Sequence, residues 1–147
     1  MTHSDAGFGA LELLAIFALG SFLAVVASPI LADITLDLRV NLVLTDAVAV
    51  RRAALDLRIQ GQPCPDTGVW GAMPAQLHSR LGSMPFSRDG VTYLWWAPDK
   101  HCGLALVGKG QSELLQRVVA RWDGLAYRVG DFAYLVIDRD VATGSGR

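Results

Sequence analysis

The chain opens with one long apolar block and continues as shorter apolar runs separated by polar ones. Residues 13–32 contain no charged side chain, and Glu12 stands directly before them. An α-helix of about 20 residues rises about 30 Å, which matches the hydrocarbon core of a bilayer. The pattern therefore predicts a membrane-spanning helix over this block, with Pro29 as a helix kink.

Two periodicities compete directly after the apolar block. Between Ile34 and Leu44, apolar residues alternate with mostly polar ones, which is the period of a β-strand. Leu dominates this alternation, however, and Leu is a good helix former. The residues alone leave helix and strand both open for this stretch.

Residues 46–60 are rich in helix formers. Asp46 is placed as a possible N-cap or first-turn acid of this stretch. Gly61 and Pro63 predict the end of the helix, because neither residue continues a helix readily.

The remaining chain predicts a small α+β head. Asp89-Gly90 and Gly130-Asp131 are expected turns, and Ser112 is an expected helix cap. The expected elements are a loop over 63–71, a short helix over 74–81, a strand over 91–97, a turn over 98–100, a strand over 103–107 that forms a hairpin with the one before it, a helix over 113–122, and strands over 125–129 and 132–137. A flexible tail over 139–147 is expected to follow.

Composition narrows the classes of function. The formal net charge is −1, so no basic excess indicates nucleic-acid binding. Only Cys64 and Cys102 are present, and they do not form a C-x-x-C pair that would indicate a zinc site. If the head is exported, one disulfide between them is expected; if it faces the cytoplasm, both remain reduced.

No catalytic constellation is evident. His101 next to Cys102 points away from it on a strand, and His78 has no acidic partner nearby in sequence. We therefore expect no catalytic residue, no metal site and no cofactor. Trp95 and Trp96 should lie on opposite faces of one strand, one in the core and one more exposed.

The amino-terminal junction resembles that of type IV pilin and pseudopilin precursors. The matching positions are Gly7, Phe8, Glu12 and Pro29. The leader departs from the family pattern because it carries Asp5 and no Lys or Arg. Taken by itself, Glu12 also fits a merely interfacial residue, and Pro29 fits an ordinary kinked membrane helix.

The resemblance implies a role for each matching residue. A prepilin peptidase would cleave between Gly7 and Phe8, and Phe8 would then be N-methylated. Glu12 would pair with the Phe8 ammonium of a neighbouring subunit and so set the subunit register. Pro29 would let the helix bend when it is packed in a filament.

The resemblance also implies an architecture: an α+β fold with a long amino-terminal helix packed on a small antiparallel sheet with short helices. The expected parts are a leader over 1–7, a membrane and filament-core helix over 8–32, its continuation over 33–60, a periplasmic head over 61–138 and the tail. The chain would cross the inner membrane once before entering a pilus or pseudopilus. Its partners would be the prepilin peptidase, other pilin or pseudopilin subunits and an inner-membrane assembly platform, with no nucleic acid.

Two functions remain open at this point. One is a structural subunit, a minor pilin or pseudopilin, of a type IV pilus or a type II secretion-like filament. The other is an uncleaved, signal-anchored periplasmic accessory protein of a pilus, conjugation or secretion apparatus. An enzyme is disfavoured because no motif supports one.

Overall fold

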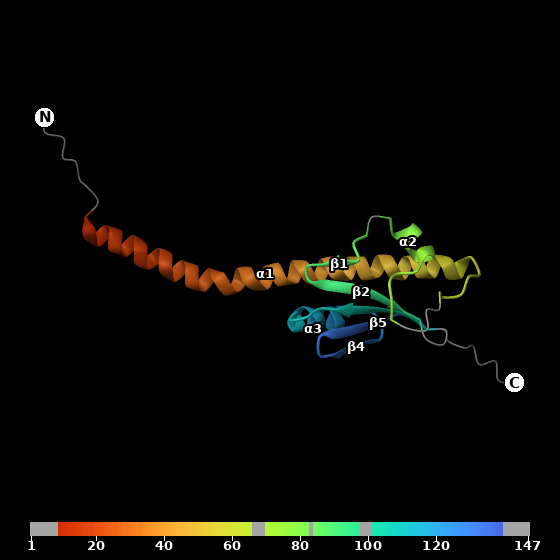
Figure 1. Ribbon diagram of the computed structural model, residues 1–147. Coiled ribbons are helices and arrows are strands. Elements are labelled where there is room, and N and C mark those ends of the chain that lie inside the picture. The colour runs from red at the N-terminus through yellow and green to blue at the C-terminus, as the bar shows by residue number, and fades with distance from the viewer. Residues whose placement is uncertain (1–8, 66–69, 83, 98–100, 140–147) are drawn as a thin grey trace, which may run out of the picture. The chain divides into compact units, whose positions relative to one another are not determined.

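The computed structural model describes residues 9–65, 70–82, 84–97 and 101–139 (Figure 1). Its contacts divide the chain into two compact units, Met1–Asp37 and Leu38–Arg147.

Helix α1 (Ala10–Ile59) contributes to both units. It includes the segment from Ile34 to Leu44, so the strand-like alternation there is overridden by a helix. In the second unit, its buried residues recur mostly at intervals of three, with Val40, Val43, Ala47 and Val50 among them. This spacing places one stripe of the helix against the core. Gly61, with φ +76°, follows the end of the helix, as the sequence predicts.

The second unit contains one antiparallel five-stranded sheet, whose strands lie in the order β1-β2-β3-β5-β4. The strands are β1 (Ser87–Arg88), β2 (Val91–Trp96), β3 (His101–Val107), β4 (Ala126–Val129) and β5 (Phe132–Arg139). The two short helices are α2 (Ala75–Leu81) and α3 (Ser112–Arg121). The α+β fold with a long amino-terminal helix is therefore as expected.

One face of the sheet, called the inner face here, holds the core. Tyr93, Trp95, Leu104 and Leu135 point to it and are essentially fully buried. Contacts from α1 to Tyr93 and from α1 to the end of α3 place both helices on this face. Burial of these large side chains supplies the main stabilisation of the head.

Several local expectations need correction. Asp46 is neither a cap nor a first-turn residue, because α1 is already continuous for many turns before it. Ser112 is the first residue of α3, and its cap position is Gln111, without a side-chain capping bond. The helix also ends at Arg121, one residue before Trp122, whose backbone is extended.

The strands differ from the expected ones mainly at their ends. β3 begins two residues earlier than expected, β5 continues to Arg139, and β4 begins at Ala126 instead of Leu125. The two-residue strand β1 was not expected at all. Asp89 and Gly90 both have positive φ, which gives the tight turn that joins β1 to β2. The expected turn over 98–100 and most of the tail lie outside the described residues.

Candidate functional site

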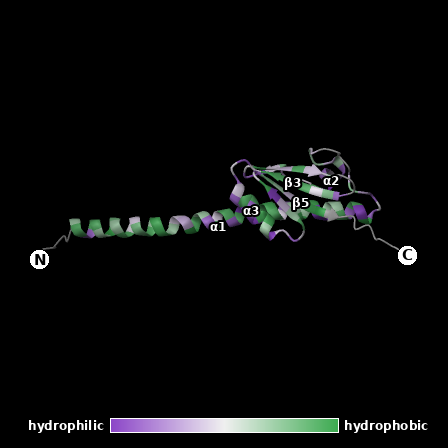
Figure 2. Ribbon diagram, turned by 90° about the horizontal axis from the view of Figure 1, so that it is seen from below, coloured by the Kyte–Doolittle hydropathy of each residue, from purple (hydrophilic) through white to green (hydrophobic). Residues whose placement is uncertain are grey.

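The apolar part of α1 has no side-chain cover within the structure. All described residues from 10 to 35 are exposed, with Phe17 at 71% and Leu19 at 66%. Figure 2 shows this part of the helix as mostly apolar. By length and composition, α1 is able to cross a membrane. A helix that is apolar all round needs a lipid or protein environment to cover it.

Glu12 lies in the first turn of α1, where its carboxylate caps the helix. Oε2 of Glu12 accepts a hydrogen bond of 3.1 Å from the backbone N–H of Gly9. This is one of the two hydrogen bonds of a capping box, in which the side chain of the third helical residue accepts from the backbone N–H of the N-cap residue. A negative charge here is also favoured by the helix dipole. Glu12 therefore has a local structural role in the single chain.

The other predicted amino-terminal residues are only partly covered by the structure. Gly7 and Phe8, the expected cleavage site, lie outside the described residues. Pro29 lies inside α1, and the helix continues on both sides of it. A kink at Pro29 and a register role for Glu12 stay predictions.

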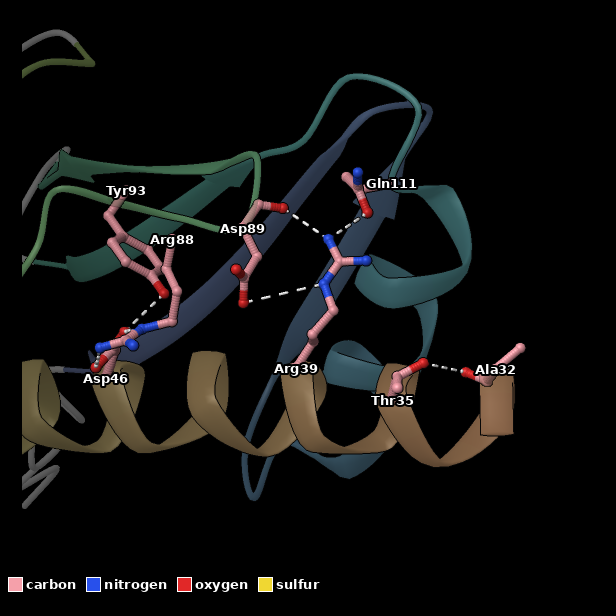
Figure 3. Close-up of polar contacts among 8 residues, drawn as sticks. All are labelled: Ala32, Thr35, Arg39, Asp46, Arg88, Asp89, Tyr93 and Gln111. Carbon is pink, nitrogen blue, oxygen red and sulfur yellow. Dashed lines mark hydrogen bonds and ion pairs between the residues drawn. The ribbon is translucent and has the colours of Figure 1, made fainter. Parts of the chain in front are cut away.

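The second unit contains a partly buried polar cluster of Asp46, Arg88 and Tyr93 (Figure 3). Arg88 donates two hydrogen bonds to the carboxylate of Asp46, of 2.6 and 3.2 Å, and the Tyr93 hydroxyl donates one of 2.9 Å. Asp46 is 8% exposed. The cluster joins α1 to the β1–β2 hairpin and satisfies a carboxylate that would be costly if buried alone.

The cluster changes the proton affinities of Tyr93 and Arg88. Burial, together with the hydrogen bond to the Asp46 carboxylate, raises the pKa of Tyr93 above its ordinary value. The same carboxylate raises the pKa of Arg88. Both shifts favour the protonated forms of Tyr93 and Arg88, in which each donates to Asp46 and holds the hairpin to α1.

A second polar contact joins α1 to two loops. Nη2 of Arg39 donates to the carbonyl of Asp89 at 2.7 Å and to the side-chain oxygen of Gln111 at 2.9 Å (Figure 3). Further along α1, Arg51 donates to the carbonyl of Asp123 and lies over the ring of Trp122. These contacts hold the β1–β2 turn and both ends of α3 against the same helix.

Cys64 and Cys102 form a disulfide, with their Cα atoms 5.9 Å apart. The bridge ties the segment after α1 to the start of β3. The predicted pairing of these two cysteines is therefore present in the structure.

Three aromatic rings gather on the other face of the sheet, called the outer face here. Trp70 stacks on Trp96 with ring centroids 4.7 Å apart, and Tyr134 meets both rings edge-on. Trp95 is buried on the inner face, so the two neighbouring tryptophans lie on opposite faces as expected. The Tyr134 ring lies over Gly103, where any Cβ atom would overlap with it. Burial also raises the pKa of Tyr134.

A groove of about 660 Å³ runs along α1 beside α2. Its lining is mixed: apolar residues such as Leu44 and Val48 alternate with polar and charged ones that include Arg52, Asp56 and Arg80. Arg80 also donates a hydrogen bond of 2.6 Å to the side chain of Gln60. The part of α1 that lines this groove is therefore accessible from outside the head.

The two histidines that the structure describes lie apart from any shared site. His78 packs against the ring of Phe86, and His101 Nδ1 is buried without a hydrogen-bond partner among the described residues. Within the same described ranges, no three His, Cys, Asp or Glu side chains are close enough to hold a metal ion.

Comparisons with known proteins give no assignment. Neither a protein-family model, nor a curated protein, nor a solved structure matches the chain.

Sequence reasoning missed the cluster around Asp46. Its partner Arg88 lies 42 residues away, and no local pattern links the two positions. One signal was present: Asp46 falls on the stripe of α1 that includes Val43 and Val50. An acid inside an apolar stripe indicates a buried partner rather than a helix cap.

Proposed function

We propose that this protein is a structural subunit, a minor pilin or pseudopilin, of a type IV pilus or a type II secretion-like filament. Its amino-terminal helix anchors the chain in the inner membrane before assembly and forms part of the filament core afterwards. Its head lies in the periplasm. The prepilin peptidase, neighbouring subunits and an inner-membrane assembly platform are its partners.

The observation that carries this proposal is the two-part character of α1. A single helix, Ala10–Ile59, is apolar and uncovered over its first part and packs against a sheet over its second. A plain membrane anchor needs only about 20 apolar residues and no helical continuity with a folded head. A filament subunit uses such a helix twice, first against lipid and then against the helices of its neighbours.

Glu12 adds a reason for assembly in a fixed register. A charged side chain at the centre of a membrane-spanning helix costs about 2.5–3.5 kcal/mol, so a carboxylate buried in the filament without a partner is also unfavourable. Pairing with the Phe8 ammonium of another copy offsets that cost in only one axial stagger. In this arrangement Oε2 of Glu12 would keep the hydrogen bond from the Gly9 N–H, and the other carboxylate oxygen would accept from the ammonium.

The amino terminus of the protein from its native host tests the proposal. Intact-mass and amino-terminal analysis should find a chain that begins at methylated Phe8. A chain that keeps residues 1–7 in a host with an active prepilin peptidase contradicts the proposal and supports an uncleaved accessory protein instead.

Substitutions of Glu12 separate its two roles. Glu12→Gln keeps an acceptor for the Gly9 N–H but has no charge. If pairing sets the register, Glu12→Gln and Glu12→Ala should both insert in the membrane normally and enter filaments more than about tenfold less well. Glu113→Ala, which removes an exposed acid of α3, is the matched control and should enter normally. Normal incorporation of Glu12→Gln would remove the register role.

A further inference from the structure

The outer face of the sheet carries no charged side chain at the outward positions of β2, β4 and β5 that are named below. Positions that alternate with the buried inner residues of β2, β4 and β5 point outward. These outward positions are Thr92, Leu94, Trp96, Tyr127, Val129, Phe132, Tyr134 and Val136. An antiparallel sheet with one solvated face normally carries polar residues there. Depletion of charge and enrichment of aromatic rings are instead typical of the core of an interface.

The apolar surface is hollowed next to β4. Trp70, Tyr127, Val129, Phe132 and Tyr134 line a depression of about 320 Å³. Three of these side chains are at least half exposed: Tyr127 at 57%, Val129 at 79% and Phe132 at 50%. The depression reaches the edge of the sheet, because β4 is its last strand.

The edge of β4 that pairs with no strand among the described residues has a defined hydrogen-bonding pattern. The N–H of Val136 donates to the carbonyl of Leu125 at 2.9 Å, so the backbone groups of Leu125 face β5. Facing direction alternates along an antiparallel strand. Tyr127 and Val129 therefore also face β5, while the N–H and C=O groups of Ala126 and Arg128 face away from the sheet. Such an edge is a template for another strand.

We propose that β4 binds an extended segment of a partner protein, which adds a sixth strand to the sheet. The outward groups of Ala126 and Arg128 would bond the backbone of the added strand. Every second side chain of that strand would lie on the outer face beside Tyr127 and Val129, and one would fill the depression. Strand addition gains affinity from the backbone and specificity from such alternate pockets.

The two faces of the added strand set the chemistry of the partner segment. On the outer face it should carry Val, Ile or an aromatic residue, because all its neighbours there are apolar. On the inner face it passes the exposed Arg128, which bonds Ser112 and Gly130. A polar or acidic residue suits that position. The segment is about five to seven residues long, since β4 itself is short.

A second copy of the chain fits this edge less well. Two β4 strands that pair antiparallel are related by a two-fold axis perpendicular to the sheet. This axis keeps the inner faces of both sheets on the same side, so a second copy would bring its own Arg128 to the inner face, where an acidic or polar neighbour suits the first copy's Arg128 better. The proposal does not depend on the filament.

Backbone amide exchange of the full chain in lipid nanodiscs tests the proposal. The probe is a synthetic peptide of about seven residues that alternates Val or Phe with Glu or Thr, and a scrambled peptide without alternation is its control. The amides of Ala126 and Arg128 should exchange fast in the free protein and slowly with the alternating peptide. The amides of Tyr127 and Val129 should be protected in both states. Protection with the scrambled peptide, or none with either peptide at millimolar concentration, overturns the proposal.

Two variants check the edge and the depression separately. Ala126→Pro removes an outward N–H without touching the bonds to β5, and it should weaken peptide binding at least about tenfold. Phe132→Ser should weaken it similarly by opening the depression. Phe86→Ser, at an equally exposed ring remote from β4, is the matched control and should bind normally. Unchanged peptide binding by both test variants contradicts the proposal. Protection of the Ala126 and Arg128 amides that rises with protein concentration in the absence of peptide also contradicts it, because this would indicate self-association.

Discussion

Asp46 on α1 and Arg88 on β1 form a two-bond ion pair, although they lie 42 residues apart in the chain. The pair is completed by the hydroxyl of Tyr93, which donates to the same carboxylate. One acid of the helix therefore holds both strands of the first hairpin.

Removal of this acid should destabilise the head. In Asp46→Ala the Tyr93 hydroxyl loses its acceptor in a buried site, which we expect to lower the free energy of unfolding by about 2 kcal/mol. Denaturant unfolding followed by tryptophan fluorescence measures this. Asp56→Ala, at an exposed acid of the same helix, should change stability little. Equal stability of the two variants would show that the cluster does not stabilise the fold.

The raised pKa of Tyr93 predicts a loss of stability in alkali. An unfolded tyrosine ionises near 10.0, whereas the folded Tyr93 keeps its proton to higher pH. Above about pH 10 the unfolded state binds fewer protons than the folded state, so the free energy of unfolding falls as the pH rises. Below about pH 9 both states keep the proton, and the free energy of unfolding does not depend on this group. The slope should approach about 1.4 kcal/mol per pH unit for each such tyrosine. Denaturant midpoints between about pH 8 and about pH 11 measure it.

Tyr93→Phe provides the control for the alkaline effect. The variant lacks the titrating hydroxyl, so its stability should depend less steeply on pH than that of the unaltered protein, whatever its starting stability. The remaining slope includes Tyr134, whose pKa is also raised by burial. An identical slope in Tyr93→Phe would refute the assignment.

Gly103 should be intolerant of a side chain because the Tyr134 ring occupies the space of its Cβ. Gly103→Ala should cost about 1–3 kcal/mol, as overpacking of a sheet commonly does. In the background of Tyr134→Ala the same change should cost much less, since the ring is gone. A double-mutant cycle measures the difference, and strict additivity would be inconsistent with the contact.

The disulfide should contribute strongly to the stability of the head. The two cysteines are 38 residues apart, and closing a loop of this length stabilises a fold by about 4 kcal/mol on chain-entropy grounds. The double variant Cys64→Ala/Cys102→Ala should unfold at a correspondingly lower denaturant concentration. Addition of a reductant should shift the unaltered protein and leave the variant unchanged. A shift of both would point to a cause other than this bridge.

Much of the fold could be predicted because its signals are local. The apolar block before Asp33, the Gly61 stop and the Asp89-Gly90 turn each act within a few residues. The helix over 34–44 was predicted against the strand-like alternation, from the resemblance to pilin precursors and from the helix propensity of Leu, and the structure confirms the helix.

The rest depends on contacts between distant segments. The Asp46 side chain was misplaced at a helix start because its partners, Arg88 and Tyr93, are invisible to local patterns. Strand β1 was missed because a two-residue strand has no period of its own and exists only by pairing with β2. The hollow beside β4 was missed since Trp70 reaches it from a loop far earlier in the chain.

The stacked pair of Trp70 and Trp96 also gives the molecule an optical property. The two indoles, with centroids 4.7 Å apart, are close enough for their electronic transitions to couple, and the circular dichroism that results depends on the twist between their transition dipoles. One partner sits on β2 and the other follows the disulfide-bearing loop. A change in this near-stacked arrangement would therefore report a movement of that loop without any added label.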